Sequence, residues 1–100
     1  MTVIVTGWVR LAPEDVAKAL PAAKAMMAAS RAEDGCDEYA YAQDLLEPGL
    51  IRVSERWRDF PALEAHFRTP HMAEWRRALA EVRLLERKVT AFEVAAERAL

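Results

Sequence analysis

Residues 36–57, CDEYAYAQDLLEPGLIRVSERW, consist of two segments of alternating side-chain character on either side of a Pro-Gly pair. Alternation with a period of two is typical of β-strands, so we predict one strand over 36–46 and another over 50–57. Pro48 and Gly49 suit the two central positions of a type II turn, which requires a positive φ at the second of them. The stretch therefore predicts a β-hairpin.

The segment before the hairpin has helical spacing. Pro13 suits the first turn of a helix, and apolar residues then recur every three or four positions as far as Met27. Pro21 lies inside this pattern and predicts a kink or a short break, because proline removes one hydrogen-bond donor from the helix. Gly35 is expected to end the segment in a left-handed conformation.

The segment after the hairpin predicts two helices. We expect the first within 58–69, with Asp59 as its N-cap, and we expect Pro70 to end or kink it. A longer helix is expected over 71–87, with His71 and Trp75 on one of its faces.

Both ends of the chain predict further strands. Residues 2–10 (TVIVTGWVR) and 88–95 (KVTAFEVA) are rich in β-branched residues. The resulting order, β-α-β-β-α-β, is the ferredoxin-like arrangement of the α+β class, a four-stranded antiparallel sheet with helices on one face. We expect residues 1–100 to form a single domain. Apolar side chains lie on both faces of the first strand, so we predict a homodimer in which two sheets pack face to face.

The composition excludes several classes of protein. The chain has 100 residues, a net charge of −2 and no basic block, which disfavours nucleic-acid binding. No apolar run reaches the length of a membrane span, and the N-terminus has no signal-peptide features. The single cysteine, Cys36, allows no intrachain disulfide and is expected to be a small buried residue rather than a nucleophile. We therefore expect a soluble cytoplasmic protein.

Several short motifs occur together in a distinctive order. They are RAEDGC at Arg31 to Cys36, Tyr39 on the next strand, Glu55 with Trp57 on the third, and AHFRTPH at Ala65 to His71. Together they resemble the antibiotic biosynthesis monooxygenase (ABM) family over nearly the whole chain. The resemblance implies the dimeric α+β barrel of that family, which agrees with the dimer expected from the first strand.

The resemblance also implies a function. Better-understood members of the family oxidise quinols and anthrones with molecular oxygen, without flavin, haem or metal. A similar protein would bind a small aromatic substrate in an apolar pocket between sheet and helices, and a base would remove a proton from it. The resulting anion would itself reduce O2, so no cofactor is expected.

The two histidines are the candidate bases, because an imidazole exchanges a proton near neutral pH. We expect His71 to be the first candidate, since it opens a helix on the face of Trp75, and His66 to be the second. The two do not predict a metal site, because they are five residues apart across a proline, whereas helical metal pairs are spaced i, i+4. The remaining pocket residues are expected to be Trp75, Trp57, Tyr39, Tyr41, Phe67, Met72 and Met27.

Glu55 shares a strand face with apolar neighbours, and a buried carboxylate needs a partner. Arg31 is the expected partner, in a structural polar pair beside the subunit interface.

Two other functions would use the same pocket. One is isomerisation of a small metabolite, which requires a base but no oxygen. The other is a dimeric ligand-binding module without turnover. Haem degradation, which occurs in another branch of this fold, depends there on an asparagine of the first strand. This chain contains no asparagine, so haem degradation is disfavoured.

Overall fold

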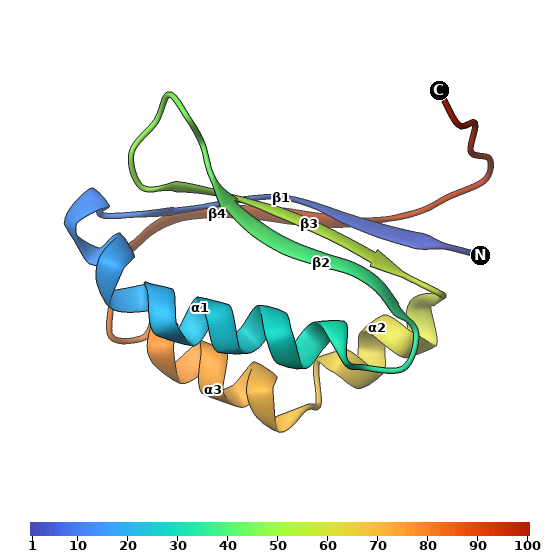
Figure 1. The fold of residues 1–100 in the computed structure, drawn as a ribbon, viewed down its shortest axis with the longest axis horizontal. Helices are drawn as coiled ribbons and strands as arrows, with labels where there is room; N and C mark the ends of the chain where they lie inside the picture. Colours follow the sequence, from blue (N-terminus) through green and yellow to red (C-terminus); the bar gives the residue numbers. More distant parts are fainter.

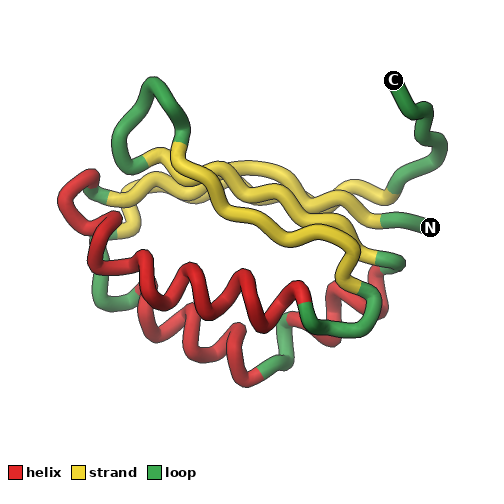
Figure 2. The backbone as a smooth tube through the Cα atoms, viewed as in Figure 1, coloured by secondary structure: helices red, strands yellow, loops and turns green.

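A computed structural model describes residues 1–100 as one four-stranded antiparallel sheet with helices on a single face (Figures 1 and 2). The strands are β1 (Val3–Leu11), β2 (Cys36–Gln43), β3 (Leu50–Trp57) and β4 (Leu84–Glu93). The helices are α1 (Val16–Arg31), α2 (Phe60–His66) and α3 (Pro70–Leu79), and a 3-10 helix (Pro13–Asp15) precedes α1. The strand order is β2-β3-β1-β4. The predicted α+β, ferredoxin-like fold is confirmed.

The central hairpin forms around the predicted turn. Gly49 has a φ of +86°, and the Leu50 amide donates to the Glu47 carbonyl at 3.2 Å, as a type II turn requires. Strand β2 is three residues shorter than predicted. It ends at Gln43 because Asp44 turns the chain, its Oδ1 accepting hydrogen bonds from the amides of Leu46 and Glu47.

Helix α1 runs through Pro21 without the predicted break. Pro21 and Ala17, whose carbonyl loses its intrahelical donor, are both exposed. Water can therefore satisfy that carbonyl, which keeps the cost of the proline low.

The prediction of one helix over 71–87 is wrong in its second half. Helix α3 ends at Leu79, and Leu84 already pairs with Leu11 in the sheet. The loop between them is fixed by Arg83, whose amide donates to Asp15 Oδ2 at 2.9 Å. The segment LLER has good helix propensity, but pairing with β1 overrides it.

The core lies between the sheet and the helices. Alternate strand residues, among them Val3, Val5, Val53 and Trp57, point toward α1 and α2 and are buried. The opposite face of the sheet is uncovered. The loop between β2 and β3 and the C-terminal tail both rise on that uncovered side (Figure 1). None of the helices is long and apolar enough to cross a membrane.

Gly7 is required at the centre of β1. Its φ is +152°, and a Cβ atom there would lie 2.8 Å from Val89 Cα and collide with the Lys88 carbonyl oxygen. We expect Gly7→Ala to lower the free energy of unfolding by about 2 kcal/mol or more, because both the backbone and the β1–β4 pairing are strained. Urea unfolding followed by tryptophan fluorescence measures this. Glu64→Ala, on the exposed side of α2, is the control, and equal losses for the two variants would contradict the prediction.

Candidate active site

A cavity of about 480 Å³ lies between the sheet and the helices. Its walls are mainly apolar, with Val5, Val9 and Val53 from the sheet and Ala23 and Leu63 from the helices. Its volume suits a small ligand. The polar or charged side chains of the wall are few: Tyr39, Tyr41, Gln43, Glu55, His66, Arg76 and Arg87.

Most of the predicted pocket residues lie in this wall. They are Tyr39, Tyr41, Phe67, Met27, Met72 and Trp75. The Tyr41 ring stacks on Trp75 with centroids 5.4 Å apart, and the hydroxyls of Tyr39 and Tyr41 share a hydrogen bond of 2.6 Å. Burial raises the pKa of both tyrosines, so both hydroxyls stay protonated at neutral pH.

Trp57 does not line the cavity, contrary to the prediction. It is fully buried in the core, and its ring packs against that of His66 with centroids 4.7 Å apart. Trp57 therefore packs against His66, a residue of the cavity wall, from within the core.

The corner between α2 and α3 places the two histidines close together. His66 is the last residue of α2, and His71 is the second residue of α3. Thr69 joins the two helices, because its Oγ1 donates to the His66 carbonyl at 2.8 Å and accepts from the Met72 amide at 3.2 Å. Pro70 suits the first position of α3. The imidazole centroids lie 5.8 Å apart as a result.

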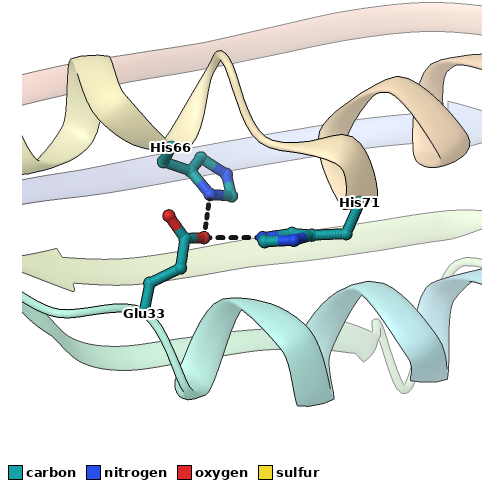
Figure 3. A group of neighbouring side chains, drawn as sticks. All are labelled: Glu33, His66 and His71. Atoms are coloured by element: carbon teal, nitrogen blue, oxygen red, sulfur yellow. Dashed lines mark hydrogen bonds and ion pairs between the residues drawn. The ribbon is translucent and has the colours of Figure 1, made fainter.

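Glu33 connects the two rings. It lies in the turn after α1, and its Oε2 lies 2.6 Å from His66 Nδ1 and 2.7 Å from His71 Nε2 (Figure 3). Both nitrogens donate to this one oxygen when each ring is neutral and carries its proton there. We call Glu33, His66 and His71 the triad.

The triad fixes the chemical state of His66. The ring is 1% exposed, and burial lowers its pKa, opposed by the hydrogen bond and charge of Glu33. The neutral ring with its proton on Nδ1 is therefore favoured at neutral pH. Nε2 then carries the lone pair, and the one side-chain hydrogen bond of His66 is made by Nδ1. His66 is thus a wall residue with a free proton acceptor.

His71 has a different place from the one predicted. It does not line the apolar cavity but a second, shallower hollow between α1 and α3, together with Ala22, Met26 and Glu74. The side chain of Trp75 lies between the two spaces and lines both. Sharing a helix face with Trp75 was therefore not enough to place His71 in the cavity.

The predicted Glu55–Arg31 pair is not formed. Arg31 lies at the end of α1, and its Nε donates to the backbone carbonyl of Tyr39 at 2.8 Å. Glu55 is 7% exposed, and its Oε1 accepts from the indole nitrogen of Trp57 at 2.9 Å. With no cation paired to it, burial raises the pKa of Glu55 to about 7.

The triad contains the donor types of a transition-metal site. Its three candidate ligand atoms lie within 4.8 Å of one another. However, the two nitrogen–oxygen distances of 2.6 and 2.7 Å are shorter than the separation of about 3 Å between neighbouring ligands around a metal with bonds of about 2.1 Å. A cation would have to replace two protons and displace Glu33. The geometry fits a hydrogen-bonded triad better than a coordination shell.

Glu33 is a residue of the site that was not predicted from the sequence. The sequence does contain a signal for it, because an acidic residue just after a helix lies at the negative end of the helix dipole, where its charge is unfavourable without a partner.

Cys36, near Glu33, is a poor nucleophile. Its pKa is raised to about 11, first by burial and then by nearby carboxylates.

Comparison with known proteins places the chain among relatives of the same fold. A protein of Mycobacterium tuberculosis (Rv0793) has 26% identity and a TM-score of 0.86 over 99% of this chain and 100% of that chain. A Deinococcus radiodurans protein, provisionally assigned as an antibiotic biosynthesis monooxygenase, has 25% identity and a TM-score of 0.88 over 100% and 98% of the two chains. A Bacteroides thetaiotaomicron protein of unknown function, described as a possible oxidoreductase, has 28% identity and a TM-score of 0.83 over 93% and 97%.

The sequence comparisons agree with the structural ones. An uncharacterized Synechocystis protein is 29% identical over 73 residues, which are 73% of this chain, and this chain spans about half (50%) of that relative's length. The family model for antibiotic biosynthesis monooxygenases matches residues 2–78, a range that contains the whole triad. The chain therefore belongs to the antibiotic biosynthesis monooxygenase family.

Proposed function

We propose that the protein is a cofactor-independent monooxygenase that oxidises a small aromatic substrate with O2, and that His66 is its base. The observation that carries the proposal is the His66 ring in the cavity wall, with Nδ1 bound to Glu33 and Nε2 free. The family match supports this class of reaction, as do the relatives provisionally described as a monooxygenase or an oxidoreductase.

The chemistry follows from the cavity. An electron-rich phenol or anthrone fits between the apolar walls, where the stacked Tyr41 and Trp75 offer a flat surface to an aromatic ring. His66 Nε2 takes a proton from the substrate, and the negative charge of Glu33 stabilises the imidazolium that forms. The substrate anion then passes an electron to O2. The apolar walls disfavour water beside the anion.

Oxygen dependence tests the proposal. We expect the protein to accelerate the oxidation of anthrone or of 1,4-naphthohydroquinone above the buffer rate, with one atom of 18O2 in the product of anthrone. No flavin, haem or metal would be added. Turnover that continues under strict anaerobiosis would instead support an isomerase, and ligand binding without any turnover would support a binding module.

Glu33 provides a further prediction. We expect Glu33→Gln to lower kcat about 10- to 100-fold, because the amide still accepts from the His66 ring but no longer stabilises its positive charge. The charge of Glu33 raises the pKa of His66, so the acidic limb of kcat/KM is expected to move to lower pH in this variant. Glu64→Gln, which removes an exposed carboxyl from α2, is the control. Equal kcat values for the two variants would exclude a role for the Glu33 charge.

We also propose that a second copy of the chain covers the open face of the sheet. Ile4, Trp8 and Phe92 lie on that face. The β2–β3 loop, which contains the exposed residues Leu45 and Leu46, rises on the same side (Figure 1). Exposed apolar groups that gather in this way are typical of an interface.

The assembly state is directly measurable. Light scattering is expected to give twice the chain mass of 11.3 kDa for the wild type. Ile4→Glu should give the single-chain mass with an unchanged circular dichroism spectrum, because a buried unpaired carboxylate is costly in an interface. Ala28→Glu, on the exposed side of α1, is the control. A dimer that survives Ile4→Glu would place the interface elsewhere.

A further inference from the structure

Glu55 is the one acidic group of the cavity wall, and the mechanism above leaves it unused. It lies on β3, between Val5 of β1 and Tyr39 of β2, which are its neighbours across the sheet. Its Oε1 accepts a hydrogen bond from the Trp57 indole at 2.9 Å, and none of the hydrogen bonds within the chain reaches its Oε2. A buried carboxyl with one fixed and one free oxygen is unusual without a function, because burying it is costly.

From this geometry we infer that Glu55 is a second proton-transfer residue, which protonates the peroxide formed when the substrate anion combines with O2. The inference rests on the proposed function and gives the proton transfers after O2 addition to a residue other than His66, which keeps its proton until the O–O bond breaks. Tyr39 is a neighbour of both groups: it pairs with Glu55 across the sheet, and its ring centroid lies 5.3 Å from that of His66.

The steps balance for a substrate whose CH2 group becomes a carbonyl. His66 takes the first C–H proton, the anion gives one electron to O2, and the two radicals combine to form a carbon–oxygen bond and a peroxide anion. Glu55, as the neutral acid, protonates the outer oxygen. Glu55 then receives the second C–H proton as the O–O bond breaks and C=O forms. The hydroxide released takes the proton from His66, which yields water and restores both residues.

This cycle needs a carboxyl that can hold and release a proton near neutral pH. Burial raises the pKa of Glu55 to about 7, which meets that need. The charged groups that act on it are Glu33, which raises the pKa, and Arg87 of β4, which lowers it. The hydroxyls of Tyr39 and Tyr41 on β2 are neutral. The carboxyl is therefore present in both forms at the pH where His66 is a base.

The experiment measures how oxygen use is coupled to product, with anthrone as the probe. Glu55→Gln keeps the size of the side chain and an acceptor for the Trp57 indole but cannot transfer a proton. We expect its initial O2 uptake to stay within about threefold of wild type, while anthraquinone formed per O2 falls about tenfold and hydrogen peroxide is released instead. Glu55→Asp should restore part of the coupling. Trp57→Phe, which removes the indole donor but keeps the carboxyl, should stay coupled.

Three results would overturn the inference. Glu55→Gln could couple O2 to product as the wild type does, or it could lose O2 uptake and product together, which would place Glu55 before the oxygen step. Trp57→Phe could also release hydrogen peroxide in place of product, which would show that the loss of the Trp57–Glu55 hydrogen bond is the cause. Absence of turnover in the wild type would instead refute the proposed function. In that case Glu55 can still be tested by infrared difference spectra between pH 6 and pH 8. We expect a band of a protonated carboxyl group in the wild type that is absent from Glu55→Gln.

Discussion

Replacement of His66 by alanine is expected to lower kcat by about 10²- to 10⁴-fold, the range that a positioned general base contributes. The loss should appear equally in kcat and kcat/KM, because the base acts in the transition state and adds little to substrate binding. Oxygen uptake and product formation should fall together, since no substrate anion forms without the base. Rates with anthrone, corrected for oxidation in buffer, provide the measurement.

His71→Ala is the matched control for this prediction. His71 donates to the same Glu33 oxygen but lies outside the cavity, so we expect its loss to reduce kcat only about 3- to 10-fold by loosening Glu33. His66→Gln, which can still donate to Glu33, guards against misfolding of the alanine variant. If His71→Ala proves more damaging than both His66 variants, the base has been assigned to the wrong ring.

Replacement of Glu55 by glutamine is expected to change how the stability of the protein depends on pH. The pKa of Glu55 is about 7 in the folded chain, against 4.5 for the free group, so the folded state binds its proton more tightly. The stability that this proton contributes is complete below about pH 4.5 and is lost as the pH rises through about 7. The shift corresponds to about 3 kcal/mol at 1.36 kcal/mol for each pKa unit.

The glutamine variant remains neutral and has no such dependence. We therefore compare the free energy of unfolding of the variant with that of the wild type at each pH. The value for the variant minus that for the wild type is expected to be about 3 kcal/mol larger at pH 8 than at pH 4. His66 titrates in both proteins, so its contribution cancels in the difference. Urea unfolding at several pH values gives the result, with Glu64→Gln as the control for an exposed carboxyl. A constant difference between variant and wild type across this range would show that Glu55 is not held as the neutral acid.

The fold could be predicted from local patterns because most of its elements have local causes. The type II turn at Pro48-Gly49 and the Asp59 cap, whose Oδ1 accepts from the Ala62 amide at 2.9 Å, follow from residues close in sequence. The end of α3 does not. It depends on Arg83 reaching Asp15 and on Leu84 pairing with Leu11, contacts between residues about seventy positions apart. Helical spacing alone cannot reveal such contacts.

The site shows the same division. Tyr39 and Tyr41 could be placed side by side from the sequence, because alternation puts them on one strand face. The hydrogen-bond partners of the charged residues could not be predicted in this way. Glu33 binds His66, which is 33 positions away in the sequence, and Arg31 donates to a backbone carbonyl instead of Glu55. Hydrogen-bond partners depend on angles between elements, and here the angle is set by Thr69 and Pro70 at the corner of α2 and α3.

Strand β4 suggests how this scaffold could acquire new substrates. Arg87, Val89 and Ala91 form part of the cavity wall, yet nearly all of β4 is exposed and no helix packs closely on it. Substitutions at such positions usually cost little stability. The family match at residues 2–78 contains the triad and ends before this strand. Changes at Val89 and Ala91 would therefore reshape the cavity while leaving the triad in place, so this strand is the part of the wall where a new substrate preference could arise.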